Sequence, residues 1–331
     1  MLQLSLNLST DYQNKSRSFL FFDGFLPFSG DNNNIWFADV RFLNREQRAS
    51  EGNLGLGYRH ELDSHPWIAG AYGFVDRRRS FDKNFFSTLT LGGELKGVDW
   101  SLGTNLYVPV GQSVKSAPSA LNAILRPTTS AGIYNIYYNQ GREAALTGFD
   151  VEAGHSIAKI PGLTAYIGGY GYPSAHQVSS RVGPLVRAEY NLSDSGLLGQ
   201  HPLMDSTVIE GFMRHDSFIG TSYYVGLKFG LNLDGTPRYA MDPLHRRMID
   251  PVWRDIDVIT ANDAKKTPIL DVKANGTPVT VAIANNLSDL KNYLSQGIDV
   301  VGVNGTINTT PAPLLTKTNS FIAPQNAVLS L

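Results

Sequence analysis

Residues 222–231, SYYVGLKFGL, alternate between two kinds of side chain with a period of two residues. One face would carry Tyr223, Val225, Leu227, Phe229 and Leu231, and the other Ser222, Tyr224, Gly226, Lys228 and Gly230. Because successive side chains of a strand point to opposite faces, this pattern predicts a β-strand with one apolar face. Its length is that of a tilted transmembrane strand, which needs about 9–11 residues.

The same period recurs along most of the chain. Twelve segments share it: 2–9, 19–28, 35–42, 53–60, 67–76, 87–95, 100–108, 147–157, 163–172, 185–192, 207–216 and 222–231. Segment 67–76 is apolar on both parities, so its faces stay unassigned. The pattern predicts an all-β fold, a twelve-stranded antiparallel transmembrane β-barrel. A soluble β-sandwich gives a similar alternation, so the period alone leaves both architectures open.

Three further features favour the membrane. The strand count is even, as in closed bacterial barrels. The connections alternate between tight ones, such as 63–66 and 96–99, and long ones, such as 77–86 and 110–145, although 193–206 is an exception. Aromatic residues also gather near strand ends, as in an interfacial girdle: Tyr58, Trp67, Phe74, Trp100, Tyr107, Tyr172, Tyr190 and Tyr223.

Composition narrows the classes of function. Charged residues make up 17% of the 331 residues, below the roughly 25% of soluble domains, and the formal net charge is −1. We therefore expect no nucleic-acid partner. The chain has no cysteine, which excludes disulfides and thiolate metal sites. Residues 1–10 alternate instead of forming the apolar block of a signal peptide, so we expect an export signal upstream of Met1 in the natural protein.

Charged residues on the polar faces are candidates to line a pore. They are Asp39, Arg41, Arg59, Glu94, Asp150, Glu152, Arg187, Glu189, Glu210, Arg214 and Lys228. An Arg or Lys facing lipid at the midplane would cost about 2–4 kcal/mol, so these side chains should point inward and form an ion-paired wall. The wall could also hold a segment after the last strand, in which Arg254, Asp255 and Asp257 are candidate contacts.

Catalytic patterns are absent from the sequence. The 7 histidines form no H-E-x-x-H motif, and no G-x-S-x-G motif exists. We expect no catalytic residue, no metal and no cofactor, although a barrel enzyme that needs neither motif remains an alternative.

The chain changes character after residue 232. Residues 233–260 are rich in charge and proline and predict a linker. Residues 261–331 predict a small β-rich segment, with strands at 269–272 and 279–283 flanking the turn Asn275-Gly276, a short helix from Leu287 to Leu294, and a strand at 298–303. Within the gap 110–145, the apolar run 133–138 predicts a hairpin that packs on the barrel rim, or alternatively an exposed contact patch.

The order of motifs resembles the β-domain of the intimin/invasin family, the inverse autotransporters. The resemblance covers roughly residues 1–260. It rests on 53–60 (NLGLGYRH), 67–70 (WIAG), 74–76 (FVD), 148–153 (GFDVEA), 187–190 (RAEY) and the linker from Arg246-Arg247-Met248 to Arg254-Asp255-Ile256-Asp257.

The resemblance implies a translocator in the bacterial outer membrane, with both barrel ends in the periplasm and no enzymatic activity. The linker would return through the pore, and a passenger of adhesin or invasin type would be displayed at the cell surface by type V secretion. The domains would be a barrel at 1–232, a pore-threading linker at 233–260 and the start of a passenger at 261–331. The passenger portion shows no obvious immunoglobulin-like repeats.

Partners implied by the family are outer-membrane lipid, the barrel-assembly machinery, periplasmic chaperones and the chain's own linker and passenger, with a host or cell-surface receptor as a further candidate. A linker of 20-odd residues at about 3.3 Å each can span a hydrocarbon core of about 30 Å. The alternative is a porin-like diffusion barrel with a periplasmic C-terminal tail.

Overall fold

A computed structural model describes most of the chain. The described residues are 2–11, 16–30, 33–45, 49–63, 65–117, 122–139, 141–173, 180–192, 194–195, 207–216, 220–231, 241–255, 260–263, 268–304, 307–308, 320–322 and 329–330. The chain forms two compact units, Met1–Lys115 with Glu143–Ala261, and Ser116–Arg142 with Asn262–Leu331.

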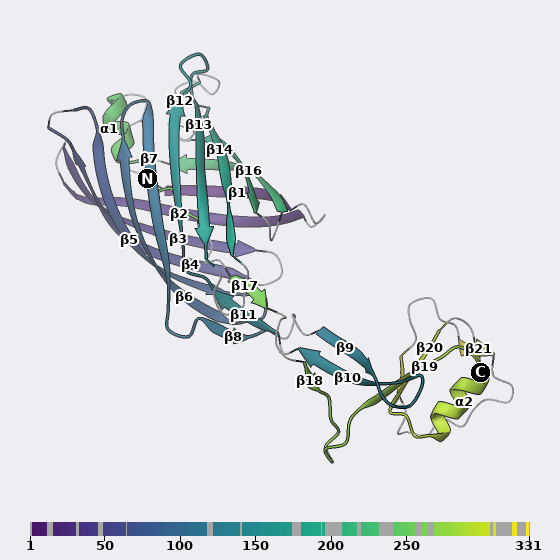
Figure 1. The fold of residues 1–331 in the computed structure, drawn as a ribbon. Coiled ribbons are helices and arrows are strands. Elements are labelled where there is room, and N and C mark those ends of the chain that lie inside the picture. The colour runs from purple at the N-terminus through teal and green to yellow at the C-terminus, as the bar shows by residue number, and fades with distance from the viewer. Residues whose placement is uncertain are drawn as a thin grey trace. The chain divides into compact units, whose positions relative to one another are not determined.

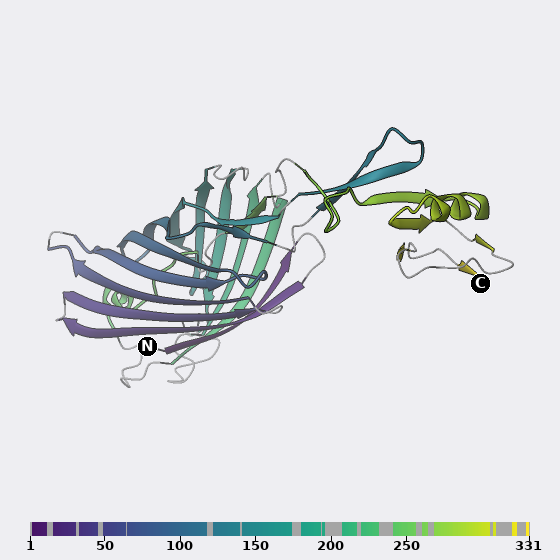
Figure 2. The same cartoon turned by 90° about the horizontal axis from the view of Figure 1, so that it is seen from below.

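The first unit is built around one large antiparallel sheet (Figures 1 and 2). Its strands are β1 (Leu2–Asp11), β2 (Ser16–Gly30), β3 (Asn34–Arg45), β4 (Ser50–Glu61), β5 (Ile68–Arg79), β6 (Phe85–Lys96), β7 (Trp100–Val110), β12 (Gly148–Ser156), β13 (Leu163–Tyr172), β14 (Arg181–Asn191), β15 (Val208–Asp216) and β16 (Gly220–Leu231). They follow the order β1-β16-β15-β14-β13-β12-β7-β6-β5-β4-β3-β2, and β1 pairs with both β2 and β16, so the sheet closes into a barrel. The predicted all-β class with mostly antiparallel strands is confirmed.

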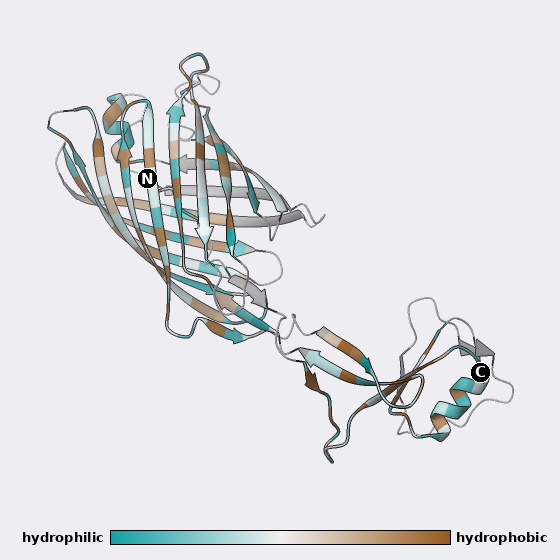
Figure 3. Ribbon diagram, viewed as in Figure 1, coloured by the Kyte–Doolittle hydropathy of each residue, from teal (hydrophilic) through white to brown (hydrophobic). Residues whose placement is uncertain are grey.

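The two faces of this sheet differ sharply in polarity. On β4, Leu54 and Leu56 are 58% and 59% exposed on the outer face, whereas Arg59 on the inner face is fully buried. Alternating brown and teal positions along the strands in Figure 3 show the same pattern. Strand β5, whose faces the sequence left open, directs Tyr72, Phe74 and Asp76 inward and Val75 outward.

Part of the expected aromatic girdle lies inside the barrel. Trp100 and Tyr223 are half exposed on the outer face, but Phe74, Tyr107 and Tyr172 are buried on the inner face, and for these three the prediction was wrong. A position near a strand end does not show which face of the sheet an aromatic ring occupies. Successive residues of a strand point to opposite faces, so the face depends on whether the residue's position is odd or even. Glycines on neighbouring strands make room for inward rings: a Cβ on Gly148 would lie 2.0 Å from the ring of Tyr172.

Two smaller elements complete the first unit. Helix α1 (Pro243–Met248) begins at Asp242, whose carboxylate accepts hydrogen bonds from the backbone N–H groups of Leu244 and His245. A three-stranded sheet has the order β17-β11-β8, from β8 (Val114–Ser116), β11 (Arg142–Ala145) and β17 (Thr260–Asp263). None of the helices in the described ranges is long and apolar enough to cross a membrane.

The second unit joins an insertion between β7 and β12 to the C-terminal residues. It contains β9 (Asn122–Pro127), β10 (Ile133–Asn139), β18 (Ile269–Leu270), β19 (Thr280–Ala284), α2 (Leu287–Ser295), β20 (Val300–Val303), β21 (Ile307–Asn308), β22 (Ser320–Ile322) and β23 (Leu329–Ser330). The sheet order is β18-β10-β19-β20-β22, with β9 beside β10, and β19, β20 and β22 run parallel. The short helix and the Asn275-Gly276 turn predicted from the sequence are confirmed.

The apolar run 133–138 belongs to the second unit. It forms β10, and its pairing with β9 confirms the predicted hairpin, whose other edge pairs with β18 and β19. Strands β18 and β19 lie far away in the sequence, and local patterning carries no information about them. The predicted division into residues 1–232, 233–260 and 261–331 stays a prediction.

Candidate functional site

The described part of the linker lies inside the barrel and starts at the end where β1 begins and β16 ends. Leu2 of β1 is paired with Leu231 of β16, so the first strand starts where the last one finishes. Helix α1 lies at this end (Figure 1), where Leu244 and Met248 pack on the buried side chain of Ile68. An ion pair of 3.0 Å joins Arg246 of this helix to Asp194, which follows β14 and lies at the same end.

From α1 the linker runs along the inner face of β7. The Arg247 guanidinium donates to the Ser101 hydroxyl at 2.8 Å, near the start of the strand. The Asn105 amide then donates to the carbonyl of Trp253 at 3.3 Å. Further on, the backbone N–H of Asp255 donates to the Tyr107 hydroxyl at 2.8 Å. Six residues of strand correspond to about 20 Å, so residues 247–255 follow more than half of the length of β7 in one direction.

Strand β5 gives the same direction independently. Its first residue, Ile68, packs against α1. Tyr72 donates to the Trp253 carbonyl at 3.5 Å, and Asp76 forms an ion pair with Arg254 at 2.8 Å. Two strands of the wall therefore agree on how the linker is oriented.

Inward side chains satisfy the linker's carbonyls. Arg41 donates to the carbonyl of Val252 at 2.6 Å, and Arg59 donates to the carbonyl of Met248. Backbone polar groups buried away from water need hydrogen-bond partners, because each one left without a partner is costly. The wall supplies those partners here, and other wall residues pair with side chains of the linker, as Asp76 does with Arg254.

The two arginines are themselves held by carboxylates. Arg41 forms ion pairs with Asp39 at 2.7 Å and with Asp23 at 3.5 Å. Arg59 pairs with Glu94 at 2.5 Å, and Lys96 contacts the other oxygen of Glu94 at 3.1 Å. Each buried cation thus has an anionic partner, as burial in a low-dielectric wall demands.

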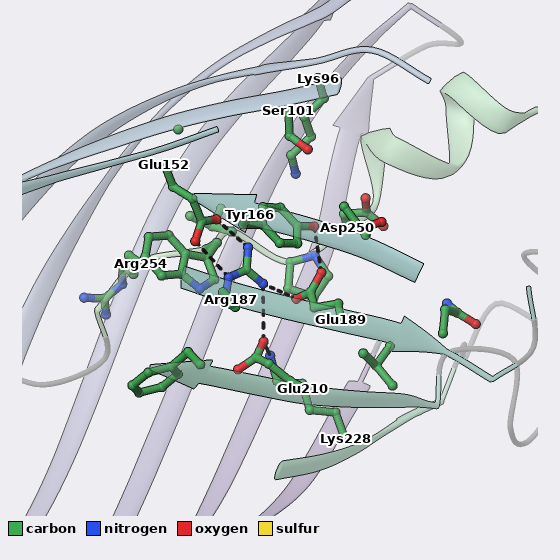
Figure 4. Close-up of a pocket in the computed structure, with 18 of the residues that line it drawn as sticks. Lys96, Ser101, Glu152, Tyr166, Arg187, Glu189, Glu210, Lys228, Asp250 and Arg254 are labelled. Atoms are coloured by element: carbon green, nitrogen blue, oxygen red, sulfur yellow. Dashed lines mark hydrogen bonds and ion pairs between the residues drawn. The ribbon is translucent and has the colours of Figure 1, made fainter. Parts of the chain in front are cut away.

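A second network lies on β12 to β16. Figure 4 shows Arg187 between Glu152, Glu189 and Glu210. Lys228 pairs with Glu210 at 2.5 Å, and Tyr166 donates to Glu189 at 2.8 Å. The Arg187 guanidinium also lies 4.8 Å from the centre of the Trp253 ring. A cavity of about 660 Å³ remains between this wall and the linker.

The structure places the predicted pore-lining residues as follows. Arg41 on β3 and Arg59 on β4 contact the linker and are paired with Asp39 and Glu94. The second network consists of Glu152, Arg187, Glu189, Glu210 and Lys228. Asp150 accepts hydrogen bonds from Asn105 and Tyr107. Arg214 and Asp255 form an ion pair at 3.3 Å, and Arg254 pairs with Asp76. Asp257 lies outside the described residues.

Sequence reasoning missed several residues that contact the linker. Asp76 was not among the candidates, because β5 is apolar on both parities and its faces could not be assigned. Tyr72 and Tyr107 were missed because aromatic residues do not signal a polar lumen, yet each contributes a hydroxyl to the linker. Trp253 was missed because its contacts depend on the path of the linker.

A known protein family matches the first half of the chain. A family model described as "Inverse autotransporter, beta-domain" matches residues 1–176. No curated protein sequence matches this chain.

Solved structures resemble the fold. A chain from "Unveiling the Mechanism Behind the in-meso Crystallization of Membrane Proteins" is 17% identical with a TM-score of 0.55, and the match covers 79% of this chain and 99% of the other. The KdgM porin has 10% identity, a TM-score of 0.40 and coverages of 70% and 99%. Outer membrane phospholipase A from Escherichia coli has 10% identity, a TM-score of 0.40 and coverages of 70% and 90%.

Proposed function

We propose that the barrel exports and displays its own C-terminal residues, because this chain belongs to the inverse autotransporter β-domain family of the outer membrane. In this proposal the sheet is a twelve-stranded transmembrane barrel. The exported part would be a passenger of adhesin or invasin type. The barrel-assembly machinery, periplasmic chaperones, outer-membrane lipid and a receptor on a host or other cell are the partners that this function requires. No catalytic step is needed.

The observation that carries the proposal is the direction of the linker. The linker starts at the barrel end where Leu2 pairs with Leu231, and it progresses along β7 from Ser101 to Tyr107. At the Tyr107 end of the barrel, Tyr107 of β7 pairs with Gly148, the first residue of β12. Strand β11 comes just before β12, and it pairs with β17, which follows the linker in the sequence. If the Leu2 end faces the periplasm, the path of the linker up to Asp255 leads toward the outer face.

A porin-like diffusion barrel with a periplasmic tail is the second candidate. The cavity of about 660 Å³ beside the linker favours some residual passage of small solutes. A periplasmic tail, however, would require the segment from Met248 to Asp255 to give up its contacts with Arg59, Arg41 and Asp76. The translocator therefore has the stronger support.

An accessibility experiment separates the two functions. The chain would be expressed with a secretion signal and an epitope tag after Leu331, and intact cells would be probed with antibody beside a periplasmic control protein. We expect labelling of intact cells. Labelling only after the outer membrane is permeabilised, with a folded barrel shown by heat-modifiable migration on a denaturing gel, would overturn export in favour of the porin-like function.

A further inference from the structure

We infer that the hairpin formed by β9 and β10, an insertion in the barrel sequence, is a template on which the exported C-terminal residues fold. The inference rests on the proposed function and deepens it. It assigns a specific partner, residues 269–303 of the same chain, to a hairpin between two barrel strands.

The first support is the strand pairing. On one side, β10 pairs with β9 over six positions, from Tyr134–Pro127 to Asn139–Asn122. On its other side, β10 pairs with both β18 and β19, through Tyr138–Ile269 and Ile133–Ala282 among others. One strand from the barrel's own sequence therefore aligns two strands from beyond the linker.

The second support is how β10 bridges an interruption in its partner. Between β18 and β19 the chain leaves the sheet and returns through the Asn275-Gly276 turn. At the gap, the backbone N–H of Asp271 donates to the carbonyl of Ile136 at 2.9 Å, and the N–H of Ile136 donates to the carbonyl of Val279 at 3.4 Å. Ile136 of β10 thus sets the register of the chain both before and after the segment 272–278 that leaves the sheet.

The third support is the hydrophobic core of the second unit. Ile133 is buried there with Ala282, Leu290, Val301 and Val303, so the hairpin contributes a core side chain to the C-terminal fold. Gly132 has a φ of +77°, and a Cβ there would lie 2.4 Å from the Tyr293 hydroxyl, which limits this position to glycine. The hairpin tip and the passenger are fitted to each other.

Chain order and folding physics explain why a template is useful. The hairpin lies between β7 and β12, so it is present as soon as the barrel has formed, whereas residues 269–303 follow the linker. Strands β19 and β20 are parallel and joined through α2, and parallel pairing, which requires such a crossover to close first, forms slowly. An existing antiparallel partner offers the emerging chain backbone hydrogen bonds at once. Arg126 and Pro127 on β9 discourage pairing at the outer edge.

The first test compares Ile133→Asp with Leu125→Asp. Ile133 is 9% exposed in the core, whereas Leu125 on β9 is 43% exposed, so only the first variant buries a carboxylate. We expect both variants to label at a C-terminal tag on intact cells. External protease should digest residues 262–331 about tenfold faster or more in Ile133→Asp, with Leu125→Asp remaining close to the parent. Equal protease resistance in Ile133→Asp and the parent would overturn the inference.

The second test measures the order of events and does not depend on that variant. The chain has no cysteine, so the pair Tyr137→Cys and Leu270→Cys, which are strand partners, can form only one disulfide. In a pulse-chase on intact cells, a template predicts that this cross-link appears before residues 300–304 become protease resistant. Resistance that precedes the cross-link would overturn the template. Absence of tag labelling in the parent chain would instead overturn the proposed export, so the two failures are distinguishable.

Discussion

Arg254 of the linker and Asp76 of β5 form an ion pair of 2.8 Å whose side chains are only 1% and 2% exposed. Asp76 also accepts hydrogen bonds from Asn53 and Thr90, and the Arg254 guanidinium lies 4.1 Å from the centre of the Phe74 ring. Loss of one partner of such a buried pair typically costs about 3–5 kcal/mol, because the other charge stays buried alone. This pair is therefore the strongest candidate for the contact that fixes the linker in the lumen.

Replacement of Arg254 should loosen the linker. In Arg254→Ala we expect larger and more frequent openings in single-barrel current recordings, because Asp76 loses its cation and the linker loses about 3–5 kcal/mol of anchoring. The control is Arg246→Ala, whose partner Asp194 is 42% exposed, so that this ion pair is worth about 0–1 kcal/mol. If the two variants conduct alike, Arg254 does not anchor the linker.

Arg187 should be required for barrel stability. In Arg187→Gln, Glu152, Glu189 and Glu210 lose a shared guanidinium, and we expect a loss of about 3–5 kcal/mol, seen as a lower temperature for loss of heat-modifiable migration. Arg187→Lys should rescue little, because a lysine cannot reproduce the two hydrogen bonds to Glu152. Lys228→Gln, which removes a cation that is 19% exposed, serves as the milder control. Full stability in Arg187→Lys would contradict this role.

Glycines opposite inward rings should tolerate no side chain. Gly148→Ala would place a Cβ 2.0 Å from the ring of Tyr172, and overpacking of this kind costs about 1–3 kcal/mol. Gly103→Ala is the matched control, because no atom outside its chain neighbours lies within 4 Å of its Cβ position. We expect a lower unfolding temperature for the first variant alone. Identical unfolding temperatures would show that the Tyr172 ring can move aside without cost to stability.

Acid should weaken the C-terminal unit through Asp299. Burial raises the pKa of this carboxyl, but hydrogen bonds from the Thr280 backbone N–H, Lys273 and the Thr280 hydroxyl outweigh it and hold the pKa below the ordinary 3.8. Because the folded pKa is lower than the unfolded one, the stabilisation is complete above 3.8 and is lost as pH falls through the folded pKa.

The measurement is the urea concentration at which residues 262–331 lose protease resistance in the full chain, at pH 7 and at pH 3. Asp299→Asn should show a smaller decrease on acidification than the parent, since its side chain does not titrate. An equal decrease in both proteins would assign the acid sensitivity to other groups.

The sequence alone determined the alternation of the barrel strands and most of the inner face. On β4, apolar Leu54 and Leu56 alternate with Gly55, Gly57 and Arg59. An arginine that faces lipid is costly, so Arg59 must point into the lumen. Gly55 and Gly57, which have the same parity as Arg59, therefore face the lumen as well. The turn at Asn275-Gly276 and the helix before Gly297 were predictable for an equally local reason, since glycine and helix-capping patterns act over a few residues.

The partners of those residues were established by contacts in three dimensions and not by local patterning. Strand β5 is apolar on both parities, so the inward position of Asp76, and with it the partner of Arg254, followed from pairing with its neighbours. The arginines that bind the carbonyls of Met248 and Val252, and the pairing of Ile133 with Ala282, join segments that are distant in the chain. Period-two patterning fixes the faces of a strand only where one parity is apolar and the other polar, whereas contacts between distant segments depend on packing in three dimensions.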